Sequence, residues 1–246
     1  MRRIATALLD LLTGDGCAGC GLPGPPLCDE CVAALPAVGP TACDRCGHPW
    51  PVRRPMCPEC IAGVATARQA LMYDGRVPAV VGALKDSGRR SLAAPLASVM
   101  ASILPPPPTG AALVPVPLAP RREADRGFNQ AALLARELCL QWGTPLAHAL
   151  GRSDGHGAQR GSAGAARRAQ VQDAFHVVGD VPLHCVLVDD VVTTGSTLSS
   201  AARALRAGGC ARVGAVALAR VALRAPGTRV GIRQIQSGGM RTWNSM

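Results

Sequence analysis

Short apolar runs alternate with helix-spaced apolar residues along most of this chain. Three mainly apolar runs, at residues 113–116, 186–188 and 213–218, are typical of strands buried in a sheet. Elsewhere apolar residues recur at helical spacing, in the sets Val80, Val81 and Leu84; Leu92, Leu96, Val99 and Ile103; and Ala131, Leu134, Leu138 and Trp142. The pattern predicts an α/β protein.

Proline, glycine and serine mark where these elements end. Pro115 and Pro117 do not suit the interior of a sheet, so we expect the first run at an edge. Ser91 is expected to cap the helix that follows it. Residues 151–172 are rich in Gly and Arg and lack an apolar face, which favours a long functional loop. The tail from Arg224 is polar and basic, and we expect it to be frayed.

The clearest chemical motif directly follows the second apolar run. Asp189 and Asp190 stand at the carboxyl end of the expected strand, and hydroxyl residues around Gly195 then lead into a helix. Hydroxyls and backbone N–H groups at a helix N-terminus bind phosphate, whereas carboxylates accept hydrogen bonds from sugar hydroxyls. This order indicates a ribose 5-phosphate site; the alternative is an acidic strand end without a ligand. The residues assigned to the site are Asp189, Asp190, Val191, Thr193, Thr194, Gly195, Ser196 and Thr197.

Cysteine pairs dominate the N-terminal part of the chain. Eight of the eleven cysteines form four Cys-x-x-Cys pairs. Each pair presents two thiolates to one metal, and two pairs complete a tetrahedral zinc site. We therefore expect two structural zinc ions. Adjacent pairs forming one site is the simpler arrangement, and an interleaved pairing stays open. The ligands are Cys17, Cys20, Cys28, Cys31, Cys43, Cys46, Cys57 and Cys60.

Two other interpretations of the cysteines fit the sequence less well. A disulfide framework is typical of secreted chains, but the apolar run from Ile4 stops at Asp10 and suits a short amphipathic helix better than a signal peptide. Thioredoxin-like redox motifs occur singly and not four in tandem. No stretch approaches the ~20 apolar residues of a membrane span. We expect a cytoplasmic protein in a reducing environment.

Charge is distributed unevenly along the 246 residues, of which 48% are apolar. The formal net charge is +10; five Arg and six acidic residues give −1 for residues 1–66, whereas twenty-one Lys or Arg and ten acidic residues give +11 for residues 67–246. We expect a cysteine-rich segment at 1–66, a second domain with its own core at 67–223, and a tail at 224–246. An anionic ligand or partner would be attracted to the second part.

Candidate contacts for an anionic substrate or a nucleic acid are mostly arginines. They are Arg121, Arg122, Arg126, Asn129, Gln130 and Arg167. Lys85, the only lysine, is a further candidate, although a lysine at a solvated helix end is the commoner case. Six aromatic residues scattered over the chain disfavour base stacking. Binding of single-stranded DNA would therefore rest on phosphate contacts by arginine.

Together these motifs resemble the ComF family, which is tied to DNA uptake in natural competence. The resemblance covers residues 17 to about 221 and rests on several motifs in the right order. Besides the cysteine pairs and the acidic signature, these motifs are the Val-Pro-Val-Pro run at 114–117, the Arg121-Arg122 pair and the Arg-Gly-Phe-Asn-Gln run at 126–130. The chain departs from the family at Asp86, where an aromatic residue is frequent, and at Ala119, where histidine is common.

The resemblance implies a doubly wound, mostly parallel sheet of the type I phosphoribosyltransferase kind, preceded by a double zinc ribbon. It also implies that 5-phosphoribosyl 1-diphosphate (PRPP) binds with Mg2+ at the acidic pair and the phosphate loop. The pyrophosphate loop would comprise Val116, Pro117 and Leu118, and residues 151–172 would be the mobile hood.

Three functions are compatible with this resemblance. The first is a PRPP-binding protein that acts in DNA uptake and contacts other competence proteins. The second is an active phosphoribosyltransferase that transfers ribose 5-phosphate to a nitrogen base or amine. The third is a PRPP-sensing regulator without catalysis. The sequence offers no recognisable nucleobase pocket, which weakens the second.

Overall fold

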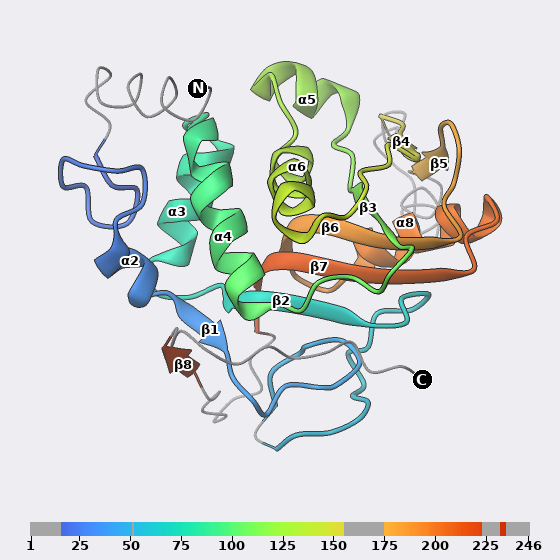
Figure 1. The fold of residues 1–246 in the computed structure, drawn as a ribbon, viewed down its shortest axis with the longest axis horizontal. Helices are drawn as coiled ribbons and strands as arrows, with labels where there is room; N and C mark the ends of the chain where they lie inside the picture. Colours follow the sequence, from blue (N-terminus) through green and yellow to red (C-terminus); the bar gives the residue numbers. More distant parts are fainter. Residues whose placement is uncertain (1–15, 51, 155–174, 223–231, 235–246) are drawn as a thin grey trace, which may run out of the picture.

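The computed structural model describes residues 16–50, 52–154, 175–222 and 232–234 (Figure 1). Its centre is a six-stranded sheet with the strand order β3-β6-β7-β2-β1-β8. Strands β3, β6, β7 and β2 are mutually parallel, and β1 is antiparallel to both β2 and β8. The bounds are β1 Pro36–Val38, β2 Ala67–Met72, β3 Ala112–Pro115, β6 His184–Val192, β7 Arg212–Arg220 and β8 Ile232–Gln234.

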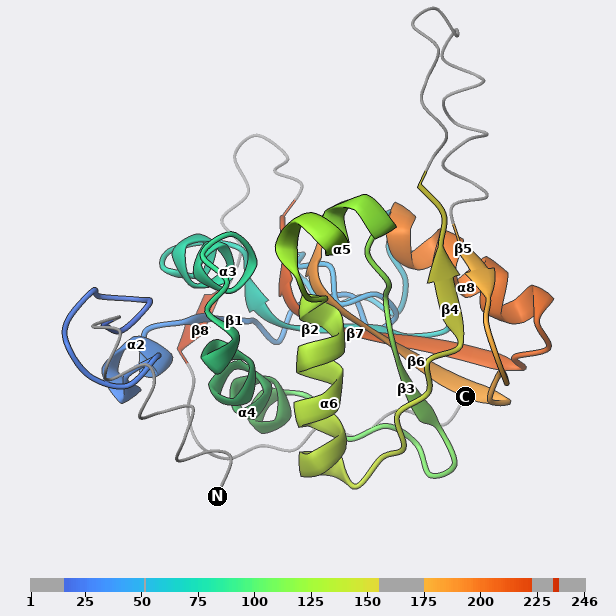
Figure 2. The same ribbon diagram turned by 90° about the horizontal axis from the view of Figure 1, so that it is seen from above.

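Helices cover both faces of the sheet (Figures 1 and 2). One face packs against α3, α4 and α6, and the opposite face packs against α8. The expectation of a doubly wound, mostly parallel α/β fold is thereby confirmed. The helices are α2 Asp29–Ala33, α3 Val77–Lys85, α4 Ala93–Ile103, α5 Pro120–Arg126, α6 Gln130–Trp142 and α8 Ser196–Ala207, with a 3-10 turn at Arg90–Leu92. A separate antiparallel pair consists of β4 Leu150–Arg152 and β5 Phe175–Val177.

The apolar runs become strands for the expected reasons. Within β7 every residue after Arg212 is buried, as befits an interior strand with both faces covered. Strand β3 stands at the end of the strand order and ends at Pro115, so the predicted edge position is confirmed. Beyond β6, it forms one isolated bridge between Leu113 and Leu146. The proline lacks the N–H group that an interior strand would need.

The starts of α6 and α4 differ in whether a side chain caps them. The side chain of Asn129 caps α6 by accepting hydrogen bonds from the N–H groups of Ala131, at 2.9 Å, and Ala132, at 3.3 Å. The prediction that Ser91 caps α4 is wrong. Ser91 lies inside the 3-10 turn, and α4 begins only at Ala93 without a side-chain cap. The tight turn preceding α4 takes the place of a capping side chain.

The described cysteines share buried clusters with the second part of the chain, which differs from the expectation of separate cores. Cys17 and Cys31 pack in one buried cluster with residues of α3, α4 and α6, whereas Cys43 and Cys46 pack in a second cluster with residues of β6, β7 and α8. Strand β1, which lies between the two groups of cysteines in sequence, is part of the central sheet. The cysteine-rich segment is too short to bury its apolar residues alone, so they pack against the second part of the chain. The division at residue 66 stays a prediction.

Some expectations concern the ends and the long loop. The amphipathic helix expected from Ile4, most of the proposed hood, and Arg167 within it lie outside the described residues. In the tail, Ile232–Gln234 forms strand β8 against β1, so a wholly frayed tail is not what the structure has. Within the described part of the chain, we find no helix with the length and apolarity needed to cross a membrane.

Candidate functional site

The acidic pair lies at the carboxyl end of β6, next to parallel strands on both sides. The Asp189 carboxylate accepts a hydrogen bond from the Asp190 N–H at 2.9 Å, and the Asp190 carboxylate accepts one from the Val191 N–H at 2.8 Å. Asp190 is buried and Asp189 partly buried. Burial, together with the negative charge of Asp190, raises the pKa of the Asp189 carboxyl well above its ordinary value. A cation or hydrogen-bond donors bound here would offset this unfavourable environment and favour the charged carboxylates.

Lys85 enters this site, contrary to the expectation that it lies on a solvated helix end. Its Nζ forms an ion pair of 2.5 Å with Asp190 Oδ2, and its side chain is only 27% exposed. Helix α3 packs on the face of the sheet from which Asp190 projects and ends at Lys85. Lys85 and Asp190 therefore place an ion pair in the site before any ligand binds.

The loop after β6 has the geometry of a phosphate cradle. Gly195 caps α8 with a left-handed backbone at φ +79°, which favours glycine. The Thr194 hydroxyl donates to Ser196 Oγ at 3.2 Å and accepts from the Ser196 N–H at 3.4 Å. Thr193, Thr194 and Ser196 are exposed. Hydroxyls and N–H groups are therefore available to an anion at the start of a twelve-residue helix.

A cavity of about 290 Å3 joins the acidic pair to most of the other predicted residues. Arg121 is not part of its wall; its backbone N–H donates to Asp154 at 3.2 Å. Thr193, Thr194, Gly195 and Ser196 adjoin the cavity without lining it, and Thr197 is the residue of 193–197 that reaches the wall. The lining residues are Lys85, Val116, Pro117, Leu118, Arg122, Arg126, Asn129, Gln130, Ala131, Arg152, Asp189, Asp190, Val191 and Thr197.

Asn129 and Gln130 both line the cavity, but they differ in role. The Asn129 amide group donates to the Val116 carbonyl at 2.9 Å while its oxygen caps α6. This side chain therefore fixes the loop at residues 116–118 to the start of a helix. Gln130 is 2% exposed, and its Nε2 has no hydrogen-bond partner among the described residues. That unpaired amide is available for a ligand in the cavity.

Arg152 is a cavity residue that sequence reasoning missed. Its guanidinium lies 4.9 Å from the centre of the Phe175 ring, across the β4–β5 pair. Burial and the nearby charge of Arg122 lower its pKa, and Asp189 opposes this shift. Its position after the apolar Ala149 and Leu150, where a short strand ends, is the signal that could have identified it.

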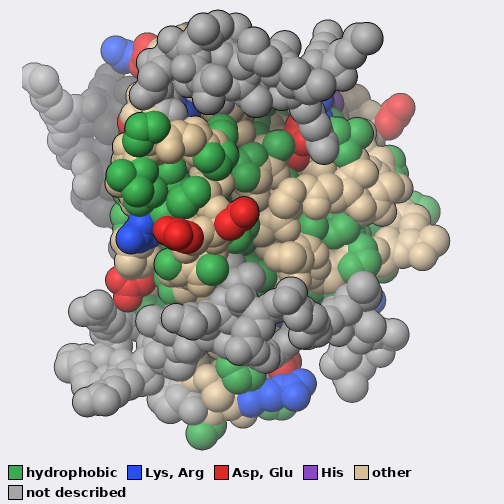
Figure 3. Space-filling model, turned by 60° about the vertical axis from the view of Figure 1, so that its left-hand side comes forward, with side chains coloured by type: hydrophobic (Ala, Val, Ile, Leu, Met, Phe, Trp, Pro, Cys, Tyr) green, Lys and Arg blue, Asp and Glu red, His purple; other side chains and the backbone are tan. Residues whose placement is uncertain are grey.

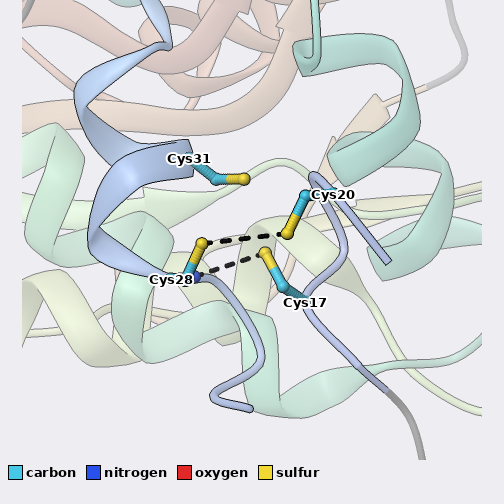
Figure 4. Close-up of side chains that lie close together, drawn as sticks. All are labelled: Cys17, Cys20, Cys28 and Cys31. Carbon is cyan, nitrogen blue, oxygen red and sulfur yellow. Dashed lines mark hydrogen bonds between the residues drawn. The ribbon is translucent and has the colours of Figure 1, made fainter. Parts of the chain in front are cut away.

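The four cysteine pairs form two groups of four, made of adjacent pairs as the simpler prediction held. In the first group Cys17, Cys20, Cys28 and Cys31 converge from α2 and the preceding loop (Figure 4). All ligand atoms of a group lie within 4.8 Å of one another. The Sγ atoms of Cys20 and Cys28 are 3.9 Å apart, and those of Cys46 and Cys57 are 3.4 Å apart. Tetrahedral zinc with Zn–S bonds of about 2.3 Å requires about 3.8 Å between sulfurs.

N–H groups donate to two sulfurs of the first cysteine group, although burial and the neighbouring thiols raise the pKa of the Cys31 thiol to about 12. Cys17 Sγ accepts from the N–H groups of Gly19, at 3.4 Å, and Cys28, at 3.3 Å. Although burial raises the pKa of the Cys17 thiol, these backbone donors lower it to about 6. Arg76, at the start of α3, donates to Cys31 Sγ at 2.9 Å. The residues therefore fit two four-thiolate zinc sites, which leave no open coordination position.

We expect purified protein to contain about two equivalents of zinc per chain. The four-thiolate groups each complete one tetrahedral site. Elemental analysis of protein prepared without chelator measures this, and Cys20→Ser should reduce the content to about one equivalent. Cys139→Ser is the control, because Cys139 is partly buried on α6 and belongs to neither group. Finding one equivalent or none in the parent protein would rule out the double site.

Fold and cavity together define a phosphoribosyltransferase-type domain, and residues 124–231 match the model of the phosphoribosyl transferase domain. Over 205 residues the chain is 34% identical to the DNA utilization protein YhgH of Salmonella typhimurium, covering 76% of this chain and 81% of the relative. It is 28% identical to the competence protein ComFC of Bacillus subtilis, over 74% of this chain and 79% of the relative. Competence protein F of Haemophilus influenzae is 37% identical over 44% of this chain and 50% of its own length. The chain therefore belongs to the ComF family of competence-associated, phosphoribosyltransferase-like proteins.

Proposed function

We propose that this protein binds PRPP with Mg2+ in the cavity at the carboxyl edge of the sheet and acts in DNA uptake. The observation that carries the proposal is that an acidic pair and a lysine–arginine wall share one cavity, and that the adjoining hydroxyl-rich helix start reaches this cavity through Thr197. Sugar hydroxyls, a 5-phosphate and a diphosphate need these three kinds of partner. Ligands of open α/β sheets bind at this edge.

The proposed roles follow from charge and position. Asp189 and Asp190 accept hydrogen bonds from the ribose hydroxyls and help to hold Mg2+, for which carboxylate oxygens are suitable ligands. Residues 193–197 surround the 5-phosphate. Lys85, Arg122 and Arg152 face the diphosphate, which extends toward the loop at residues 116–118. Lys85 then exchanges part of its pairing with Asp190 for the ligand's negative charge.

Calorimetric titration of PRPP tests this proposal directly. We expect saturable binding that tightens when Mg2+ is added, because the cation screens the carboxylates from the diphosphate. Ribose 5-phosphate, which lacks the diphosphate, should bind more weakly. The absence of PRPP binding at millimolar concentration would contradict the proposed site.

The role in DNA uptake is supported by the names of the relatives, which speak of competence and DNA utilization. The charge distribution agrees with it, since residues 67–246 carry the +11. The face shown in Figure 3 has mainly hydrophobic and other uncharged side chains among its described residues, with a few separate acidic and basic ones and no large basic patch. Reduced cysteines at both metal groups suit a cytoplasmic location. In that compartment the protein would meet incoming DNA and other competence proteins.

Catalysis is a second candidate function, favoured by the cations that line the cavity. Lys85, Arg122 and Arg152 could stabilise the negative charge of departing pyrophosphate. A screen for PRPP-dependent pyrophosphate release over nitrogen bases and amines tests it. If PRPP binds without turnover with any acceptor, a PRPP-sensing role is the better description.

We expect DNA binding to depend weakly on sequence and steeply on salt. The basic charge is arginine without a stacking array, so phosphate contacts dominate and displace counterions. Arg126→Ala should weaken binding of a single-stranded oligonucleotide and lower the salt slope by about one unit. Arg53→Ala, in the acidic segment, is the control and should change neither. Fluorescence anisotropy across a salt series measures both quantities, and salt-independent binding would contradict a phosphate-contact mode. Arg167→Ala is the corresponding test for the loop at 151–172.

A further inference from the structure

The residue after the last zinc ligand lies directly beneath the phosphate loop. Ile61 follows Cys60 and is 4% exposed. A Cβ atom placed on Gly195 would lie 2.6 Å from Ile61 Cγ1, 2.9 Å from Cδ1 and 3.4 Å from Cγ2, so the glycine backbone rests on this side chain. The three atoms nearest to that Cβ all belong to Ile61. Ile61 is therefore a direct contact between the segment that follows the second cysteine group and the loop.

The segment after Ile61 is held firmly against the helix that begins at the loop. The Gly63 carbonyl accepts a hydrogen bond from Arg206 Nε on α8 at 3.1 Å, and a Cβ on Gly63 would lie 3.6 Å from Ala202 Cβ. The Ala65 N–H donates to the Val213 carbonyl of β7 at 2.8 Å. This segment is thus fixed between α8 and the sheet, and Ile61 cannot move independently of either.

The second cysteine group holds the other end of the segment. Cys43, Cys46 and Cys57 share a buried cluster with Ile61 and with Leu198 on the first turn of α8. Cys60 is a ligand in the group, so a bound zinc would fix the backbone immediately before Ile61. Loss of the metal would release that backbone and, with it, the support under Gly195.

We propose that Ile61 is a positioning residue for the phosphate loop and makes metal binding at Cys43, Cys46, Cys57 and Cys60 cooperative with PRPP binding. The inference rests on the proposed function of the cavity. N–H groups bind phosphate well only when they are already directed at it. Ile61 fixes the position of the loop backbone at Gly195. Because such coupling is reciprocal, PRPP must strengthen zinc binding as zinc strengthens PRPP binding.

Truncation of Ile61 tests the PRPP side of this coupling. Calorimetry should show that Ile61→Ala weakens PRPP binding about tenfold, within the usual range of coupling between sites. Ile61→Val, which removes only the terminal methyl, should have a smaller effect in the same direction. Val64→Ala is the matched control, since Val64 is 2% exposed in the same cluster and segment but is not among the atoms nearest Gly195. It should bind PRPP within about twofold of the parent.

Zinc release tests the reciprocal side and separates positioning from general stability. With a chromophoric zinc chelator, PRPP and Mg2+ should slow release of one of the two zinc equivalents from the parent protein. They should slow it in Val64→Ala but much less in Ile61→Ala. Equal release with and without PRPP in the parent, or unchanged PRPP affinity in a zinc-replete Ile61→Ala protein, would overturn the inference. Failure of the parent to bind PRPP at all would instead contradict the proposed function on which it rests.

Discussion

Loss of zinc from the second cysteine group is expected to unfold the entire protein and not only its N-terminal segment. Cys46, at 1% exposure, lies in the same buried cluster as residues of β6, β7 and α8. A structural zinc ion contributes roughly 10–16 kcal/mol of folding free energy. A domain's whole free energy of unfolding is typically about 5–15 kcal/mol. Cys46→Ser should therefore abolish the cooperative thermal transition followed by circular dichroism.

Cys139→Ser provides the control for this experiment. It removes a thiol that belongs to neither metal group, so the protein should retain two zinc equivalents and a melting temperature close to that of the parent. A Cys46→Ser protein that loses one zinc but still melts at the parental temperature would show that the core is divided after all. Such a result would support an independent N-terminal domain.

Replacement of both aspartates, Asp189→Asn and Asp190→Asn, is expected to reduce PRPP affinity severely. The substitution keeps shape but removes two charges and the partner of Lys85. Each charge-assisted hydrogen bond contributes roughly 1.5–3 kcal/mol, so each loss weakens binding about tenfold or more. DNA lacks the 2′-hydroxyl and presents a phosphate backbone, so DNA affinity should hold or rise slightly as repulsion falls.

Calorimetry with PRPP and anisotropy with a single-stranded oligonucleotide measure the two affinities. Asp180→Asn is the matched control, because Asp180 is exposed in the turn between β5 and β6, outside the lining of the cavity. If the double variant binds PRPP as tightly as the parent does, the ribose-binding role of the pair is wrong. If it loses PRPP and DNA together, both ligands use one site.

Local sequence order was sufficient for much of this architecture. The succession of Val186, Asp189, Gly195 and Leu198 specifies a buried strand, an acidic edge, a tight loop and a helix, each from a few neighbouring residues. The cysteine spacing similarly specifies two metal groups, and Pro115 an edge strand. These features depend on short-range stereochemistry, which a single sequence displays.

Features that depend on distant partners were not accessible in the same way. Lys85 reads as a solvated helix end until the sheet brings Asp190 to its ammonium group. Arg152 gains significance only because the β4–β5 pair brings it to the cavity that Arg122 also lines. Nothing local to Ile61 shows that it lies beneath Gly195. Conversely, Ser91 satisfies the usual capping pattern, but a 3-10 turn before α4 overrides that local preference.

The place of β1 in the sheet has a consequence for how this protein can be rearranged during evolution. Strand β1 comes from the chain between the two cysteine groups, yet it lies between β2 and β8. Replacing residues 1–66 by recombination would withdraw that strand and turn β2 into an open edge with unpaired backbone groups, a template for aggregation. The metal-binding segment is therefore not an exchangeable module, and its inheritance is tied to that of the sheet it completes.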